Sequence, residues 1–337
     1  MPKLRFARND SKNSQAQVPS LIWTGKEPDT NKISIIGAGN VGATCAQRIL
    51  EKGYADVVLL DIIEGLPQSR ALDISQSAPI LRFNTRIIGT NDYQDTADSD
   101  VVIITSGASR KPGMTRDELL TTNANIVTEV TRNVIKYSPD CIIVMVTNPV
   151  DVMTHLALRL SGFSRDRVLG LSGVLDGARL ATFIAAELNV SVEGVSPCVL
   201  GQHGENMVVI PRLTTVHGTP ITEILPAETI SRLVERTVKG GAEIISLLKT
   251  GSAYYTPSAA AVQMAEAIVR DEKRVLTCAA YLDGEYGLKD TVIGVPVKLG
   301  RNGIEQIIEL ELTAEEKAQL TSSAEAVKQT IGKLKIG

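Results

Sequence analysis

The stretch that decides the fold is Ile33-Ser34-Ile35-Ile36, followed at once by Gly37-Ala38-Gly39-Asn40-Val41-Gly42. An apolar run without strict alternation is typical of a strand that is buried on both faces of a parallel sheet. The glycines fit the pattern G-x-G-x-x-G, after a strand and before a helical segment. They permit a tight turn and let the backbone approach a pyrophosphate, to which the helix N-terminus offers N–H donors. The stretch therefore predicts a dinucleotide-binding unit.

A carboxylate follows the next apolar run. Residues 57–60 lead into Asp61, which lies 19 residues after Gly42. Its carboxylate can accept hydrogen bonds from both hydroxyls of an adenosine ribose, and it would repel a 2′-phosphate. The pattern favours NAD over NADP. The alternative interpretation is a structural glycine turn with a surface aspartate.

Strands and helices alternate through the first half of the chain. Strands are expected at 33–36, 57–60, 101–105, 142–147 and 168–171, with helices at 43–52, 65–76, 119–137 and 150–161. Strand–helix–strand alternation predicts right-handed βαβ units and a doubly wound parallel sheet. We therefore expect an α/β fold with an N-terminal Rossmann domain.

The pattern changes after about residue 190, which predicts a C-terminal α+β substrate domain. Strands are expected at 195–200, 207–211 and 214–216, a turn at 217–220, long helices at 227–249 and 259–270, an antiparallel pair at 275–281 and 292–299, and a last helix after Thr313. The resulting division is a tail at 1–30, the NAD-binding domain at 31–173 and the substrate domain at 174–337.

Composition narrows the class of protein. The chain has 337 residues, of which 43% are hydrophobic and 22% charged, as in globular proteins of about two domains. A net charge of −3, from 35 basic and 38 acidic residues, argues against a nucleic-acid binder. The apolar runs are too short to span a membrane.

Four widely spaced cysteines indicate free thiols in a reducing compartment and no metal site, so we expect a cytoplasmic protein. Residues 1–30 are interpreted as a loose tail, with a transit peptide as the alternative.

Two arginines, Arg110 and Arg116, flank a Lys-Pro-Gly-Met-Thr segment after the strand at 101–105. Loops at the carboxyl ends of parallel strands line the ligand crevice, and Arg can hold a carboxylate with two parallel hydrogen bonds. The pattern indicates a loop that closes over an acidic substrate, although a solvated basic turn is the simpler alternative.

Three further polar side chains are candidates for the crevice. Asp176 and Arg179 are spaced to share one helix face, where a surface ion pair is the alternative. His203 lies between two glycines, in Gly201-Gln202-His203-Gly204-Glu205, and is either a site residue or a structural histidine. Asn148 follows the strand at 142–147.

Taken in order, these motifs resemble the lactate/malate dehydrogenase superfamily. The matching stretches are G-A-G-N-V-G, V-V-L-L-D, S-R-K-P-G-M-T-R, V-T-N-P-V-D, V-L-D-G-A-R and G-Q-H-G-E. The segments D-I-I-E-G-L-P-Q and G-S-A-Y-Y-T-P look like the lactate-dehydrogenase-like malate dehydrogenase branch. The resemblance extends from about residue 31 to the C-terminus and leaves out the tail.

The resemblance implies a role for each substrate-side residue. His203 would donate and accept the proton, and Asp176 would orient that imidazole. Arg179 would hold the carboxylate next to the reacting carbon, and Arg116 would polarise the reacting carbonyl. Asn148 would donate a hydrogen bond near the substrate and the nicotinamide. A histidine suits this chemistry because its ordinary pKa is about 6.5.

The resemblance also implies which residues contact the cofactor NAD. Asn123 matches a cofactor contact and Thr147 should line the cofactor. The full set is Gly37, Gly39, Asn40, Val41, Gly42, Asp61, Asn123, Thr147 and Asn148.

The substrate prediction depends on Arg110. Related lactate dehydrogenases commonly carry Gln at this position, whereas Arg110 would pair with the second carboxylate of malate or oxaloacetate. Ala253 would leave room for the larger acid. The expected activity is NAD-dependent oxidation of (S)-malate to oxaloacetate and its reverse. Alternatives are an L-lactate or broad 2-hydroxy-acid dehydrogenase, a dinucleotide-binding protein without chemistry, and a sugar-modifying Rossmann enzyme whose metal pair would be Cys198 and His203.

The expected partners are malate or oxaloacetate, with no nucleic acid and no membrane. The resemblance implies a homo-oligomer, with a tetramer favoured and a dimer possible. The helices at 65–76 and 227–249 could supply subunit contacts, or could equally pack on the core.

Overall fold

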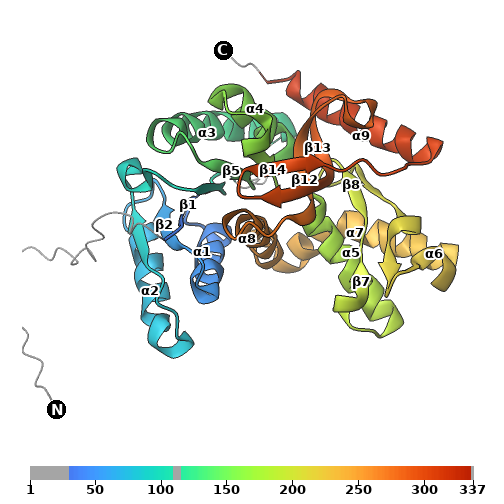
Figure 1. Cartoon of the computed structure of the whole chain (residues 1–337), viewed down its shortest axis with the longest axis horizontal. Helices are drawn as coiled ribbons and strands as arrows, with labels where there is room; N and C mark the ends of the chain where they lie inside the picture. Colours follow the sequence, from blue (N-terminus) through green and yellow to red (C-terminus); the bar gives the residue numbers. More distant parts are fainter. Residues whose placement is uncertain (1–29, 109–114, 335–337) are drawn as a thin grey trace, which may run out of the picture.

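One large sheet organises the chain. A computed structural model describes residues 30–108 and 115–334. Its main sheet has the strand order β3-β2-β1-β4-β5-β6-β12-β13-β8-β9, and β14 pairs with β13 outside this path. Figure 1 shows the parallel strands of the N-terminal half on the left and the antiparallel strands of the C-terminal half on the right. The α/β fold with a Rossmann-type half is confirmed.

The N-terminal strands form because their residues are apolar on both faces. All pairings among them are parallel. The strands are β1 (Lys32–Ile36), β2 (Asp56–Leu60), β3 (Ile87–Thr90), β4 (Val101–Ile104), β5 (Ile142–Met145) and β6 (Val168–Gly170). Five of them were expected from buried apolar runs. The edge strand β3 was not, because its short sequence Ile-Ile-Gly-Thr carries little strand signal and its middle residues are only half-buried.

Helices cover both faces of these strands. On one face lie α3 (Arg116–Tyr137) and α4 (Val150–Ser161). On the other lie α1 (Asn40–Lys52) and α8 (Tyr255–Val269), which comes from the C-terminal half and packs against α1 (Figure 1). The N-terminal half is thus completed by a helix from the second half of the sequence.

Helix α2 extends beyond the C-terminal end that the sequence predicts. The structure gives α2 as Leu66–Leu81, whereas the expected helix ends at residue 76. Pro79 lies within its last turn. A proline discourages extension in a sequence-based assignment, but here it removes only one hydrogen bond near the helix end.

The C-terminal half continues the same sheet with antiparallel strands. It contains β12 (Arg274–Asp283), β13 (Lys289–Gly300), β14 (Gly303–Ile307), β8 (Val199–Gly201) and β9 (Met207–Val209). A small second sheet has β7 (Val195–Ser196), β10 (Thr215–Val216) and β11 (Thr219–Pro220). The helices of this half are α5 (Gly173–Leu188), α6 (Ile221–Ile224), α7 (Ala227–Leu248) and α9 (Ala314–Ile331).

The expected single strand at 195–200 is wrong in detail. Residues 195–196 form β7 in the small sheet, and residues 199–201 form β8 in the large one. Pro197 separates them. Because proline has no N–H to donate to a ladder, the chain leaves one sheet there and enters the other.

The junction between the two halves depends on a close approach at Gly294 of β13. Gly294 pairs with Gly201 at the end of β8. A Cβ on Gly294 would lie only 2.8 Å from the carbonyl oxygen of Gly201 and would overlap the hydroxyl of Ser172, which precedes α5. The missing side chain therefore lets the end of β8 and the start of α5 meet.

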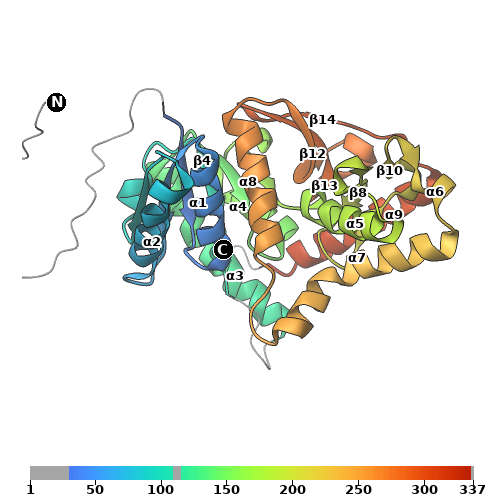
Figure 2. The ribbon, with the colours of Figure 1, turned by 90° about the horizontal axis from the view of Figure 1, so that it is seen from below.

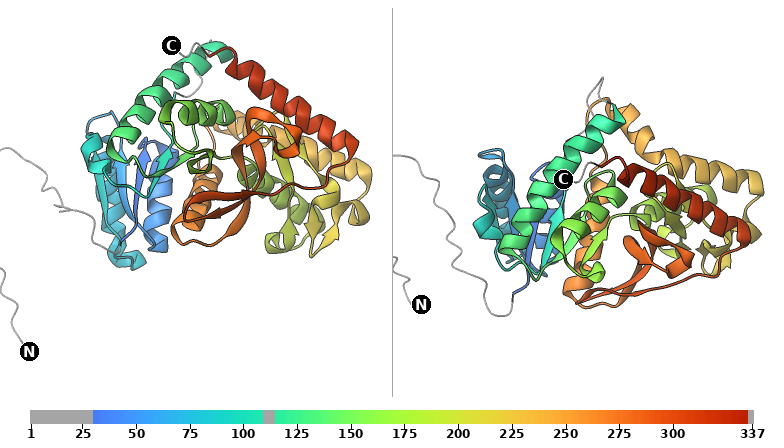
Figure 3. Two further views of the ribbon diagram at one scale, coloured as in Figure 1. Left: turned by 45° about the horizontal axis from the view of Figure 1, so that its top comes forward. Right: turned by 90° about the horizontal axis from the view of Figure 1, so that it is seen from above.

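The long helices converge on one side of the molecule. Figures 2 and 3 show the start of α3, the end of α7 and the end of α9 in the same region. Lys333, after α9, forms an ion pair with Asp117 in the first turn of α3 at 2.9 Å. None of the helices in the described residues has the length and apolar composition needed to cross a bilayer.

Candidate active site

The centre of the site is an imidazole–carboxylate pair. His203 lies in the turn between β8 and β9, and Asp176 lies in the first turn of α5. The Nδ1 atom of His203 lies 2.7 Å from Oδ2 of Asp176. The two side chains are only 13% and 1% exposed. The sheet junction thus joins two residues that are 27 positions apart in the sequence.

The carboxylate outweighs the effect of burial on the imidazole. Burial by itself lowers the pKa of His203, because it disfavours the charged form. The charge of Asp176 and its hydrogen bond act in the opposite direction, and the pKa of His203 is raised above its ordinary value. With Nδ1 facing Asp176, the other ring nitrogen, Nε2, is the atom that can exchange a proton with a ligand.

Arg179 extends this pair into a cluster. Its Nη1 donates to Oδ1 of Asp176 at 3.3 Å, and its side chain is 14% exposed. Its Nε is buried and has no hydrogen-bond partner among the described residues. Burial lowers the pKa of Arg179, opposed by the charge of Asp176. Asp176 thus engages only part of the guanidinium, which carries its positive charge next to the His203–Asp176 pair.

Arg116 is placed near the cluster but is engaged elsewhere. A capping box between Thr115 and Glu118 starts α3, so that Arg116 is the first helical residue. Its Nη2 donates to Oε1 of Glu205 at 2.8 Å, and both side chains are more than 70% exposed. Because Glu205 is two residues from His203, this ion pair holds Arg116 beside the histidine turn.

The residues after β4 and β5 form a hydrogen-bonded rim. Asn123 of α3 accepts from the N–H of Ala108 at 2.7 Å and donates to the carbonyl oxygen of Asn148 at 2.8 Å. Thr147 donates to the carbonyl oxygen of Ser106 at 2.7 Å. The Asn148–Pro149 peptide bond is cis, and Asn148 is exposed. Asn148 is thus exposed at this rim, whereas the side-chain amide of Asn123 is hydrogen-bonded to the backbone through both its oxygen and its nitrogen.

The glycine loop fits a dinucleotide. A Cβ on Gly42 would overlap the carbonyl oxygen of Gly37, so close packing within the protein requires that glycine. Gly39, at the N-cap of α1, has φ −67°, and a Cβ there would meet nothing within 4 Å. No packing contact among residues 30–108 and 115–334 requires Gly39, and no side chain in these ranges caps the helix. The open space beside free N–H donors is what a pyrophosphate needs.

Asp61 is held against the same loop. One of its carboxylate oxygens accepts from the N–H of Ala38 at 2.7 Å, and the other accepts from the N–H of Ile63 at 3.0 Å. Each oxygen retains a second lone pair, so these contacts orient the carboxylate and still allow it to accept ribose hydroxyls. Together with Gly39, Asp61 makes these residues a suitable site for NAD.

The structure describes one of the two residues that are predicted to set substrate specificity. Arg110 lies outside the described residues. Ala253 lies between α7 and α8 and is half-buried. Of the other predicted site residues, His203, Asp176 and Arg179 are brought into one cluster, while Asn40 and Val41 begin α1 beside the glycine turn.

Sequence reasoning missed three contributors to the site. Asp151 accepts from the backbone N–H of His203 at 3.0 Å, and Glu205 pairs with Arg116. The side chain of Arg179 lies against Gly240 and Gly241 of α7, where a Cβ on Gly240 would be 3.2 Å from Cδ of Arg179. The only signal for this last contact is a Gly-Gly pair inside a helical pattern, which is costly without a packing reason.

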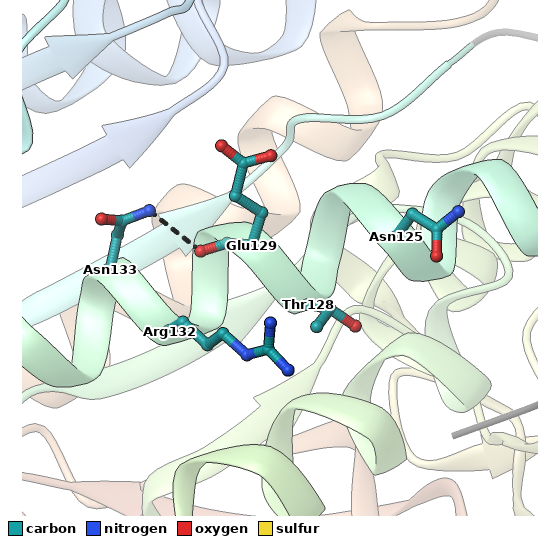
Figure 4. Close-up of a pocket in the computed structure, with 5 residues that line it drawn as sticks. All are labelled: Asn125, Thr128, Glu129, Arg132 and Asn133. Carbon is teal, nitrogen blue, oxygen red and sulfur yellow. Dashed lines mark hydrogen bonds between the residues drawn. The ribbon is translucent and has the colours of Figure 1, made fainter. Parts of the chain in front are cut away.

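A separate hollow of about 390 Å³ lies along α3. It is lined by residues of that one helix: Asn125, Thr128, Glu129, Arg132 and Asn133 (Figure 4). The amide of Asn133 donates to the backbone oxygen of Glu129 at 3.0 Å. None of the predicted site residues is among these lining residues, so the hollow does not belong to the histidine cluster.

A dinucleotide-binding turn and a histidine–carboxylate–arginine cluster on one sheet are the features of a nicotinamide-dependent dehydrogenase. Comparison with known proteins is more specific. A family model described as lactate/malate dehydrogenase, NAD binding domain, matches residues 31–170. A second, described as lactate/malate dehydrogenase, alpha/beta C-terminal domain, matches residues 173–335. The chain belongs to the lactate/malate dehydrogenase family.

Individual relatives cover most of the chain. A malate dehydrogenase from Dehalococcoides mccartyi is 58% identical over 90% of this chain and 99% of its own length. The solved malate dehydrogenase of Salinibacter ruber is 50% identical over 90% and 97% of the two chains, with a TM-score of 0.86. A Cryptosporidium parvum lactate dehydrogenase, complexed with lactic acid and NAD, is 40% identical over 92% and 99%, with a TM-score of 0.89. The fold is therefore shared by malate and lactate enzymes.

The two glycines of the loop make separable predictions. Gly42→Ala should lower the free energy of unfolding by about 1–3 kcal/mol, because the new methyl group overlaps a backbone oxygen. Gly39→Ala should leave it within about 0.5 kcal/mol but weaken NADH binding, because its methyl group enters the space offered to the pyrophosphate. Urea unfolding and NADH fluorescence titration measure the two effects. Unchanged NADH affinity in Gly39→Ala would contradict the assignment of this space.

Proposed function

We propose that the protein is an NAD-dependent malate dehydrogenase that interconverts (S)-malate and oxaloacetate. The observation that carries this proposal is the buried His203–Asp176–Arg179 cluster, in a chain 58% identical to a malate dehydrogenase over 90% of its length. The family relationship supports the dehydrogenase chemistry, and Arg110 supports the choice of malate over lactate.

The proton is handled by His203. Bound NADH supplies the hydride that reaches the carbonyl carbon in the reductive direction. His203, kept protonated by Asp176, donates a proton from Nε2 to the carbonyl oxygen. In the oxidative direction neutral His203 accepts the hydroxyl proton of malate, and Asp176 stabilises the imidazolium that forms.

Two arginines bind and polarise the substrate. Arg179 holds the carboxylate adjacent to the reacting carbon, next to Nε2 of His203, since Asp176 anchors only one side of its guanidinium. Arg116 releases Glu205 and stabilises the negative charge that develops on the reacting oxygen. Asn148 donates a hydrogen bond from the rim after β5. Catalysis in this scheme needs Arg116 to exchange one carboxylate partner for the substrate oxygen.

The cofactor site lies over the first turn of α1. Backbone N–H groups of Asn40, Val41 and Gly42 bind the pyrophosphate, with Gly37 and Gly39 allowing its approach. Asp61 accepts the ribose hydroxyls. Thr147 lines the nicotinamide side, and Asn123 contributes by holding the segments after β4 and β5 together.

Substrate choice rests on Arg110. Its charge pairs with the second carboxylate of oxaloacetate, and pyruvate would leave it without a partner. An L-lactate or broad 2-hydroxy-acid dehydrogenase is the alternative, because a lactate dehydrogenase shares the fold with a TM-score of 0.89. Relatives that are 58% and 53% identical, from Dehalococcoides mccartyi and Methanosarcina barkeri, are malate dehydrogenases, which favours malate.

We also propose two domains, at residues 31–173 and 174–337, and a cytoplasmic location. We further propose that the protein is a homo-oligomer, with a tetramer favoured. Large apolar side chains are exposed on α2 and near the end of α7, where Ile80 is 80% and Leu247 76% exposed. Burial of such side chains between subunits is their simplest use. The cysteines are free, in keeping with a reducing compartment.

Replacing Arg110 tests the substrate. Arg110→Gln should reduce the preference for oxaloacetate over pyruvate by about two to four decades in kcat/KM, because it removes the partner of the second carboxylate. NADH oxidation with each acid measures this preference. Lys111→Gln, a neighbouring charge in the same segment, is the matched control and should leave it unchanged. Equal or greater pyruvate turnover by the parent would overturn the malate assignment.

Replacing Asp176 tests the proton relay. Asp176→Asn should lower kcat/KM for oxaloacetate by about 10²–10⁴-fold. Since reduction needs protonated His203, and the variant loses the charge that raises the pKa of His203, the residual activity should fall off at lower pH than in the parent. Steady-state rates across a pH series measure this shift, with NADH affinity as the control. A uniform loss at every pH would argue against the relay.

The oligomer can be tested through α7. The parent should elute with a light-scattering mass four times that of one chain, and Leu247→Glu should lower that mass, because a charge in an apolar contact is costly to bury. A monomeric parent would contradict the proposal.

A further inference from the structure

A second buried carboxylate lies behind the histidine. Asp151 is the second residue of α4 and is 1% exposed. Its Oδ2 accepts from the backbone N–H of His203 at 3.0 Å. Its Oδ1 is buried and has no hydrogen-bond partner among the described residues. A buried carboxylate that satisfies only one oxygen is costly, and its retention needs a reason.

Asp151 and Asp176 reach His203 from different helices. Asp176, on α5, binds the ring at Nδ1, whereas Asp151, on α4, binds the backbone of the same residue. The turn that carries His203 has positive φ at Gly201 and Gly204, 83° and 110°. The N–H of Gln202 in this turn donates to Oγ of Ser323 at 2.8 Å, and the contact to Asp151 fixes the next residue, His203, itself.

The charges around Asp151 give it an electrostatic effect as well. It is faced by His203 from the turn and by Asp176 from α5, while Arg179 faces the His203–Asp176 pair. Burial raises the pKa of Asp151 to about 7, with His203 acting to lower it. Ionised Asp151 and protonated His203 therefore stabilise each other, and their titrations are coupled.

We propose that Asp151 is a positioning residue of the proton relay: its hydrogen bond holds the His203 backbone, and its charge favours the protonated imidazole. The inference rests on the proposed role of His203 as the proton donor. It assigns Asp151 no contact with substrate or cofactor. The relay then consists of one imidazole between two buried carboxylates, of which Asp176 sets the ring and Asp151 sets the main chain.

Asp151→Asn separates charge from hydrogen bonding. Its amide oxygen can still accept from the His203 N–H, but the charge is lost. The acid form of His203 should then persist over a narrower pH range. We expect kcat/KM for oxaloacetate to fall about tenfold at the alkaline end of the profile and to stay within about twofold at the acid end. Asp56→Asn, which removes a buried carboxylate of β2, is the matched control and should keep the parent profile.

Titration of His203 gives a readout that does not depend on turnover. The chain has three histidines, so His203 can be followed by ¹H–¹⁵N NMR of the imidazoles. Its midpoint should move to lower pH in Asp151→Asn and not in Asp56→Asn. An unchanged midpoint, or an equal loss of kcat/KM at every pH, would overturn the proposal. If only the proposed function fails, the parent does not reduce oxaloacetate but the His203 midpoint still shifts.

A measurement on the parent covers the case in which Asp151→Asn does not fold. The Asp151 carboxyl, followed by ¹³C NMR, should titrate in steps shared with His203. An Asp151 carboxyl that titrates once, in the ordinary range of aspartate and independently of His203, would overturn the proposal.

Discussion

The hydrogen-bonded ion pair between His203 and Asp176 is the interaction on which the site depends. It requires the end of β8 and the start of α5 to meet, and β6, β12, β13 and β8, which belong to one sheet, bring them together. The junction is tight enough that Gly294 can carry no side chain. The large sheet is therefore a structural prerequisite for the chemistry. The strands between β6 and β8 set the distance between the turn that carries His203 and the helix that carries Asp176.

The cluster also shows how a buried site of low dielectric constant can hold a protonated imidazole. Burial alone would discharge His203, and two carboxylates oppose that effect from α5 and α4. Arg179 balances part of the negative charge. A charged group is tolerated in such a place only with partners. The partners here come from separate helices, so the charge balance depends on tertiary structure.

The sequence predicted what depends on local pattern or on whole motifs. Buried apolar runs located the central strands, and the resemblance of ordered motifs indicated the family and His203 with its partners. It could not predict that β6 pairs with β12, because one registered pair, Ala279 with Gly170, leaves no periodic signal. The sequence could not predict the contact between Asp151 and the backbone of His203 for a similar reason. It is made to a backbone N–H, which every residue other than proline has, and so no residue type at 203 reveals it.

The unbroken sheet has an evolutionary consequence. Because the two halves share hydrogen-bonded strands, the spacing between the nucleotide turn on β1 and the histidine turn on β8 is set by the fold itself. Selection for a different 2-hydroxy acid can then leave the scaffold unchanged and act on a few side chains around the rim. The similar TM-scores to malate and lactate enzymes, 0.86 and 0.89, are what such divergence leaves behind.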